Sequence, residues 1–103
     1  MVWFKIMGKE TASQKSLETL RREIDELDRQ LFLLIAKRMA VVREIGDRKR
    51  SQGLPVSDPV REALLKAKLK EFSAAVLEPW HVEELASVIL RISRDLQSQK
   101  EGK

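Results

Sequence analysis

The residues of this sequence that could do chemistry are chiefly cationic, and their spacing suits the binding of a small dianion. Arg38 and Lys49 are eleven residues apart, which is three helical turns, so both would lie on nearly the same face of one helix. Their backbones would be ~16 Å apart, and two long side chains that lean towards each other could hold one small dianion between them. Arg21 precedes Arg38 by 17 residues, roughly 25 Å along a helix. It could therefore reach such a ligand only in a partner chain.

Arg38 also interrupts an apolar pattern. From Leu17 to Leu34, leucine or isoleucine recurs at alternating spacings of three and four, and the pattern then calls for apolar side chains at positions 38, 41 and 45. The chain has Val41 and Ile45 at two of these positions and Arg38 at the third. A buried guanidinium without a partner is costly, so Arg38 must either meet an anion or lie along the seam with its head in water. The residue alone leaves both interpretations open.

Two further groups of polar residues could contribute to the same site. Asp58, Arg61 and Glu62 are spaced by three and four, so they would follow one face of a second helix. The alternative is a capping aspartate beside a surface ion pair worth about 0.5 kcal/mol. Ser93 and Gln97 are one helical turn apart and border an apolar stripe, where small polar residues are usually incidental. Each group is weak evidence by itself.

Composition excludes several classes of chemistry. The chain has no cysteine, so it can form neither a disulfide nor a thiolate zinc site, and it has no thiol nucleophile. Its single histidine, His81, cannot by itself build a metal site or a Ser-His pair.

A formal net charge of +4 permits nucleic-acid binding, yet it suits a site for small anions equally well. No apolar run approaches the roughly 20 residues that span a bilayer. The opening MVWFKIM is too short for a signal peptide core, so we expect a cytoplasmic protein with no membrane partner.

The elements that must position these residues are predicted to be three helices, which makes the fold class all-α. The 103 residues suit one domain, and nothing alternates with the period of two that a strand requires. The helices are expected over about 17–52, 59–73 and 79–98, with caps at Ser16 and Asp58. Gly46 should interrupt the first helix only mildly, at about 1 kcal/mol relative to alanine.

The predicted organisation is a loose N-terminal leader over residues 1–15, in which Met7 could be the true start, a helical domain over 16–99 and a polar tail over 100–103. A first helix of about 35 residues would be roughly 50 Å long, whereas a compact globule of this size has a radius of gyration of only ~13 Å. Two shorter helices cannot cover so long a seam from one side. We therefore predict a homodimer in which the long helices pack against each other. A helical hairpin with a frayed end is the alternative.

Taken together, the motifs resemble the all-helical class of chorismate mutases over roughly residues 17–97. The segment LRREIDELDRQL, which begins at Leu20, fits the pattern LRxxIDxLDxxL. It is followed by Arg38, by the lysine eleven residues later, and by PVSDPVRE, which fits P-V-x-D-x-x-R-E. The last piece is S-x-x-x-Q at Ser93 and Gln97. One piece would be a weak signal, but all of them in this order and at compatible spacing are specific.

This resemblance implies an architecture, a reaction and a set of contacts. The family forms an intertwined dimer of three-helix chains with two equivalent sites, each of which borrows one arginine from the partner; here that residue would be Arg21. Arg38 would bind a substrate carboxylate, and Lys49 a carboxylate and the ether oxygen of the breaking bond. Gln97 would hydrogen-bond the same ether oxygen. The reaction is the rearrangement of chorismate to prephenate in phenylalanine and tyrosine biosynthesis, and it needs no metal and no cofactor.

The resemblance also implies roles for the residues around the substrate ring. Glu62 would meet the ring hydroxyl, and Asp58 would contribute through the backbone at the start of its helix. Arg61 would support the site with Ser93, and Ile45 would line the pocket. The residues expected to act in catalysis itself are Lys49, Gln97, Arg38 and Glu62.

Two alternatives remain open. Isochorismate-pyruvate lyases are similar to chorismate mutases in scaffold and in the cationic residues that bind substrate, so the substrate could be isochorismate. Glu62, which is matched to the chorismate hydroxyl, favours the mutase. The other alternative is a basic helical module, not an enzyme, that binds nucleic acid or a partner coiled coil. Its affinity for phosphates would fall steeply with salt. Such a module should carry its basic residues along an exposed face, whereas Arg38 lies on the seam.

Overall fold

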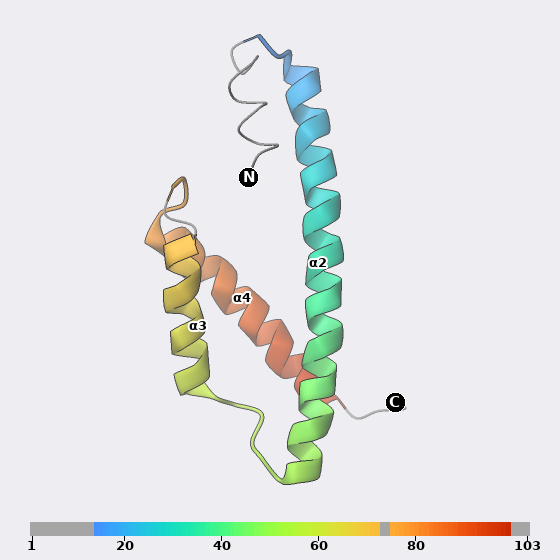
Figure 1. Ribbon diagram of the computed structural model, residues 1–103, viewed down its shortest axis with the longest axis vertical. Helices are drawn as coiled ribbons and strands as arrows, with labels where there is room; N and C mark the ends of the chain where they lie inside the picture. Colours follow the sequence, from blue (N-terminus) through green and yellow to red (C-terminus); the bar gives the residue numbers. More distant parts are fainter. Residues whose placement is uncertain (1–13, 73–74, 100–103) are drawn as a thin grey trace. The chain divides into compact units, whose positions relative to one another are not determined.

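Three helices make up most of the part of the chain that this computed structural model describes, which is residues 14–72 and 75–99. They are α2 (Leu17–Gln52), α3 (Pro59–Phe72) and α4 (Pro79–Ser98), and no strand occurs in the described residues (Figure 1). The all-α fold class, with one very long helix, is therefore confirmed. Most of the predicted leader (residues 1–13) and the predicted tail (100–103) lie outside the described residues.

The ends of α2 are set by local hydrogen bonds. Ser16 caps the first turn, because its Oγ accepts a hydrogen bond of 3.1 Å from the backbone N–H of Thr19. Gly53 follows the last turn with φ of 70°, in the left-handed region that glycine enters without steric cost. Beyond it, the N–H of Leu54 donates to the carbonyl of Lys49 at 2.8 Å. Both boundaries agree with the prediction.

The two shorter helices also begin at caps, and each has proline as its first residue. At the start of α3, the carboxylate of Asp58 accepts a hydrogen bond of 3.1 Å from the backbone N–H of Arg61. At the start of α4, the backbone N–H of Glu78 donates to Nδ1 of His81 at 2.9 Å. His81 thus serves a structural purpose at a helix end.

The described residues fall into two units, with the boundary between Ala36 and Lys37 inside α2. The second unit contains the C-terminal part of α2 together with α3 and α4. Its interior is small. Gly46 and Met39 of α2 meet Gln97 and Ser93 of α4, while α3 packs against α4. The buried residues are Met39, Val42 and Gly46 on α2 and Val82, Ala86, Leu90, Ser93 and Gln97 on α4.

Within one chain, α4 covers a different face of α2 from the predicted seam. Val41 and Ile45, which the pattern placed at the seam, are 55% and 42% exposed, whereas the next residues, Val42 and Gly46, are buried. Consecutive residues differ by about 100° around a helix. The face that α4 covers is therefore turned by one residue from the face that continues the leucine pattern.

Gly46, which was predicted only to interrupt the helix mildly, is needed for the close contact between α2 and α4. A Cβ placed on it would be 2.7 Å from both the Cα and the carbonyl oxygen of Gln97. Distances that short do not occur in real structures, so only glycine lets the two helices approach this closely. The site described below lies beside this approach.

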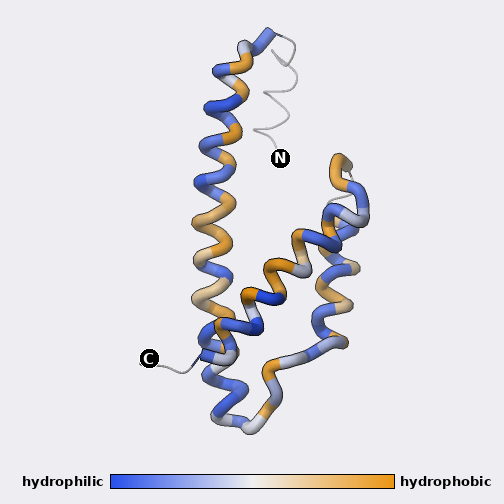
Figure 2. Tube along the Cα trace, turned by 180° about the vertical axis from the view of Figure 1, so that it is seen from behind, coloured by the Kyte–Doolittle hydropathy of each residue, from blue (hydrophilic) through white to orange (hydrophobic). Residues whose placement is uncertain are grey.

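The apolar residues of the N-terminal part of α2 are exposed. Leu17, Ile24, Leu31 and Leu34 have exposed fractions between 50% and 63%. Figure 2 shows hydrophobic residues recurring between hydrophilic ones along this helix. Large apolar side chains at helical spacing form a stripe that normally faces another element. The homodimer that was predicted to cover this stripe stays a prediction. Among the described residues, no helix has both the length and the apolar content to cross a membrane.

Candidate active site

A pocket of about 150 Å³ lies in the second unit, between the C-terminal part of α2, the start of α3 and the C-terminal half of α4. Every site residue predicted from the sequence except Arg21 lines it. Arg21 is exposed and lies in the first unit. The lining residues are Arg38, Val42, Ile45, Lys49, Val56, Asp58, Arg61, Glu62, Leu65, Leu90, Ser93 and Gln97.

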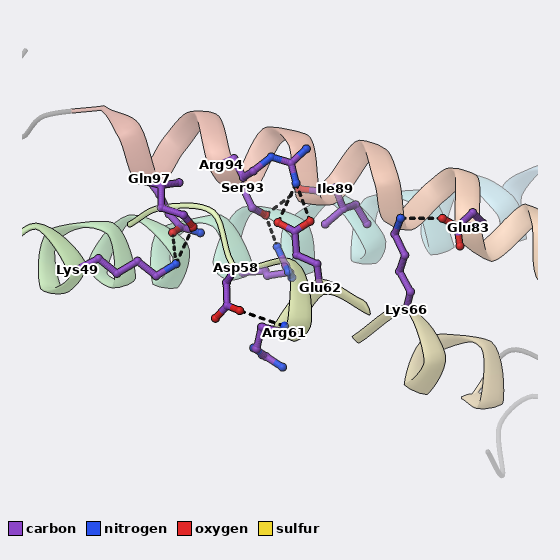
Figure 3. Close-up of polar contacts among 12 residues, drawn as sticks. Lys49, Asp58, Arg61, Glu62, Lys66, Glu83, Ile89, Ser93, Arg94 and Gln97 are labelled. Atoms are coloured by element: carbon purple, nitrogen blue, oxygen red, sulfur yellow. Dashed lines mark hydrogen bonds and ion pairs between the residues drawn. The ribbon is translucent and has the colours of Figure 1, made fainter. Parts of the chain in front are cut away.

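At one end of the pocket, a lysine and a glutamine are joined by a hydrogen bond. Nζ of Lys49, on α2, donates a hydrogen bond of 2.8 Å to Oε1 of Gln97, on α4, and another of 2.9 Å to the carbonyl of Val56 (Figure 3). An ammonium group has three N–H donors, so one stays available. The amide nitrogen of Gln97 has two more. Because Gln97 is only 9% exposed, these donors are held in a largely dehydrated place.

At the other side, Arg38 turns into the pocket. Its Nη1 donates a hydrogen bond of 2.7 Å to Oγ of Ser93, which in turn donates to the carbonyl of Ile89 at 2.7 Å. Burial, and secondarily the positive charge of Arg61, lower the pKa of Arg38. Within the described residues Arg38 pairs with no carboxylate. The guanidinium therefore presents an unneutralised charge to the pocket instead of lying along the helix with its head in water.

Ser93 and Gln97 are more central than the sequence indicated. The pattern placed them at the border of an apolar stripe, whereas in the structure they are 3% and 9% exposed and face α2. A buried hydroxyl or amide needs hydrogen-bond partners, and here both partners are cations from α2. The pairing could not be found from spacing, because it joins residues about 50 positions apart.

The carboxylate of Glu62 enters the pocket from α3 and is held by an arginine that the sequence did not single out. Nη1 of Arg94, on α4, lies 2.7 Å from Oε1 and 2.8 Å from Oε2 of Glu62 (Figure 3). Arg94 does not line the pocket, so it reaches Glu62 from outside. No periodicity relates Arg94 to α3, which is why sequence reasoning missed it.

A second missed residue is Arg50. Its Nη1 donates a hydrogen bond of 2.6 Å to the backbone carbonyl of Gln97, and its Nη2 pairs with Asp47 one turn earlier on α2. The last carbonyls of a helix have no partner within the helix, so a cationic side chain satisfies one of them. Arg50 thus secures the last turn of α4, which carries Gln97.

Asp58 and Arg61 occupy the rim. Both are exposed, and the carboxylate of Asp58 is engaged by the backbone N–H of Arg61 as the cap of α3. The hydrogen bond that holds Ser93 comes from Arg38, while Arg61 adds a positive charge near that arginine. Whether Arg61 and Asp58 act on a ligand as the resemblance implies stays a prediction.

The arrangement can bind and polarise an anion. Three cations, Arg38, Lys49 and Arg61, line the pocket, and the apolar side chains of Val42, Ile45, Leu65 and Leu90 complete the wall. Among the described residues, no group of three or more histidine, aspartate or glutamate side chains could hold a metal ion.

A wider hollow of about 490 Å³ along α3 and α4 offers less to a ligand. Its cations, Lys66 and Lys70, are already paired with Glu83 at 2.7 Å and 3.2 Å.

The chain is similar in sequence to several known proteins. The sequence pattern of chorismate mutase type II matches residues 20–98. The chain is 37% identical over 86 residues to the T-protein of Haemophilus influenzae and 36% identical over 85 residues to that of Enterobacter agglomerans. Each match covers 82% of this chain but 23% of the T-protein, so the chain spans less than a quarter of these relatives. It is also 30% identical over 57 residues to the chorismate mutase of Methanocaldococcus jannaschii, which is 55% of this chain and 58% of that protein.

Proposed function

The chain belongs to the chorismate mutase type II family, as its motifs predicted, and on this premise we propose that it rearranges chorismate to prephenate in aromatic amino-acid biosynthesis. One observation carries the proposal. Arg38 and Lys49 from α2 converge with Ser93 and Gln97 from α4 in a pocket that also holds Glu62 from α3. Oriented side chains from α2 and α4 thus share one pocket with the carboxylate of Glu62.

The reaction explains why such residues suffice. In this pericyclic step one C–O bond breaks as one C–C bond forms, so no nucleophile or proton transfer is required. The enzyme must hold a flexible dicarboxylate in its folded, near-attack shape. It must also stabilise the negative charge that develops on the ether oxygen, using donors that are already oriented in a dry site.

Lys49 and Gln97 are proposed to act on the ether oxygen. Their mutual hydrogen bond of 2.8 Å orients both side chains before substrate arrives. The free N–H groups of the ammonium and of the amide can then point at one oxygen atom. Because Gln97 is nearly buried, little reorganisation is needed when charge develops, which is the condition for strong electrostatic catalysis.

Arg38 is proposed to bind one carboxylate of the substrate. Ser93 holds Nη1 of this guanidinium, and its remaining N–H donors can form the paired contacts that arginine makes with carboxylates. Glu62 is proposed to accept a hydrogen bond from the ring hydroxyl. Asp58 and Arg61 would complete the rim, and Ile45 would contribute an apolar contact.

The second carboxylate is proposed to bind Arg21 of the partner subunit. The exposed apolar stripe along α2, from Leu17 to Leu34, supports a homodimer in which this stripe is covered by a second copy. Ile45 is 42% exposed although it lines the pocket, so the site has an open side that a second copy could close. Sedimentation of the protein at micromolar concentration would give the mass of a dimer under this proposal and that of a single chain otherwise.

The activity test is direct. Loss of chorismate is followed by ultraviolet absorbance, with prephenate identified as the product, for wild type and for Lys49→Ala. We expect Lys49→Ala to lower kcat by at least about a hundredfold, the usual effect of removing one oriented donor. Helix content measured by circular dichroism should not change. Wild-type protein that leaves chorismate unconverted would overturn the proposal.

The same assay, run with isochorismate, addresses the lyase alternative. Release of pyruvate without formation of prephenate from chorismate would favour the lyase. The nucleic-acid alternative has less support, because Arg38 is half-buried in the pocket and Lys49 is engaged with Gln97. A gel-shift titration at two salt concentrations would reveal phosphate binding if it occurs.

A further inference from the structure

Arg94 touches a residue of the proposed site without lining the pocket itself. Its Nη1 contacts both carboxylate oxygens of Glu62, at 2.7 Å and 2.8 Å. The two side chains are partly shielded, with 39% of the arginine and 23% of the glutamate exposed. The pair joins α4 to α3 at the level of the pocket (Figure 3).

We propose that Arg94 is a positioning residue that holds the carboxylate of Glu62 at the place where it meets the ring hydroxyl of the substrate. This inference rests on the proposed function and adds a residue to its site. Arg94 would act through Glu62 and would not touch the substrate.

Glu62 needs such a restraint because other cations surround it. Arg61 is its neighbour in sequence, and Arg38 lines the same pocket. A glutamate side chain has several rotatable bonds, and without a fixed partner its carboxylate would be drawn to either of these charges.

The surroundings of Arg94 make it a suitable restraint. It follows Ser93, which is buried and hydrogen-bonded, so the backbone that carries Arg94 is fixed against α2. One nitrogen of its guanidinium serves both oxygens of Glu62. Each carboxylate oxygen has two lone pairs, so each retains one that can accept the hydrogen bond of a substrate hydroxyl. The restraint therefore leaves Glu62 able to bind.

The chain offers a matched control for the structural part of this role. Glu83, on α4, pairs with Lys66, on α3, at 2.7 Å and so forms a second ion pair between the same two helices. Glu83 does not line the pocket. Removing it weakens the contact between α3 and α4 without touching the carboxylate of Glu62.

The experiment compares wild type, Arg94→Ala, Arg94→Lys and Glu83→Ala, with chorismate and with an analogue in which hydrogen replaces the ring hydroxyl. For chorismate, Arg94→Ala should lower kcat/KM by about tenfold to a hundredfold, the effect of misplacing a site group by roughly 1 Å. Arg94→Lys should recover part of this loss, because lysine restores one charged donor. Glu83→Ala should stay close to wild type.

The analogue separates positioning from structure. Since it has no hydroxyl for Glu62 to hold, Arg94→Ala should react with it at the wild-type rate. Equal losses with chorismate and with the analogue would mean that Arg94 supports only the fold, and would overturn the inference. So would a wild-type rate of Arg94→Ala with chorismate. If wild-type protein converts neither compound, the proposed function itself fails, which is a different result from a failure of Arg94 alone.

Discussion

Replacing Gly46 by alanine tests how finely the site depends on the approach of two helices. A Cβ at position 46 would be 2.7 Å from the Cα and the carbonyl oxygen of Gln97, whereas ordinary contacts begin at 3.4 Å. The last turn of α4 must therefore withdraw by about 0.7 Å, the difference between these two distances. Backbone atoms cannot give way as a flexible side chain can. The hydrogen bonds of 2.8 Å from Lys49 and 2.6 Å from Arg50 to Gln97 would lengthen accordingly.

Two opposing terms decide the stability of Gly46→Ala. Overpacking a well-packed contact costs about 1–3 kcal/mol, while alanine is favoured over glycine in a helix by about 1 kcal/mol. The free energy of unfolding should thus fall by no more than about 2 kcal/mol. The effect on kcat should be clearer than the effect on stability. Because a misplacement of 1 Å can lower a rate about a hundredfold, a shift of this size predicts a loss of kcat of about tenfold or more.

Gly53→Ala is the matched control. This glycine has φ of 70°, and nothing lies within 4 Å of the position of its Cβ. Alanine there costs about 1–2 kcal/mol of backbone strain but displaces no neighbour. The two substitutions should therefore differ in their effect on kcat: Gly53→Ala should lower stability and leave kcat unchanged, whereas Gly46→Ala should lower kcat. The measurements are kcat for chorismate and the midpoint of urea unfolding. A wild-type kcat in Gly46→Ala would refute the argument that its close contact positions Gln97.

Three further outcomes are expected. Gln97→Ala should lower kcat by about a hundredfold or more through loss of an oriented donor, with circular dichroism unchanged; a near-normal rate would argue against its assigned role. A mixture of Arg21→Ala and Arg38→Ala chains should recover partial activity if sites are shared between subunits, and no recovery after confirmed subunit exchange would count against the trans arginine. The hydrogen bond from Arg29 lowers the pKa of Glu26 from 4.5 to about 2. The pair's contribution to stability is then fully present above pH 4.5 and is lost as pH falls through about 2, and an NMR titration of Glu26 with a midpoint near 4.5 would contradict this.

The side chains of the proposed site differ in how firmly they are held. The donors proposed for the ether oxygen, Lys49 and Gln97, are tied to each other and to backbone, and Arg50 secures the turn that carries Gln97. The carboxylate of Glu62 is instead restrained by a partly exposed arginine. This difference predicts that substitutions around Gln97 act mainly on kcat, whereas substitutions of Arg94 act through the recognition of one hydroxyl.

The sequence by itself determined the helices and the types of residue available for chemistry. Ser16, Asp58 and two prolines mark helix starts through local hydrogen bonds and backbone restrictions, and the three-four spacing of apolar residues marks helix faces. The eleven-residue separation of Arg38 and Lys49 placed them on nearly the same face of α2. These features depend only on neighbours within a few residues, so they can be read without knowing how the helices pack.

Only the tertiary structure decided which faces meet. It turned the buried side of α2 by one residue from the leucine pattern, buried Ser93 and Gln97, and gave Gly46 its role at the closest approach. It also joined Arg94 to Glu62 across 32 positions of sequence. Contacts between helices depend on their rotation and separation, and a shift of a single residue changes the face by about 100°. The spacing of apolar residues within one helix does not reveal that rotation, because the rotation is set by the fit of one helix surface against another.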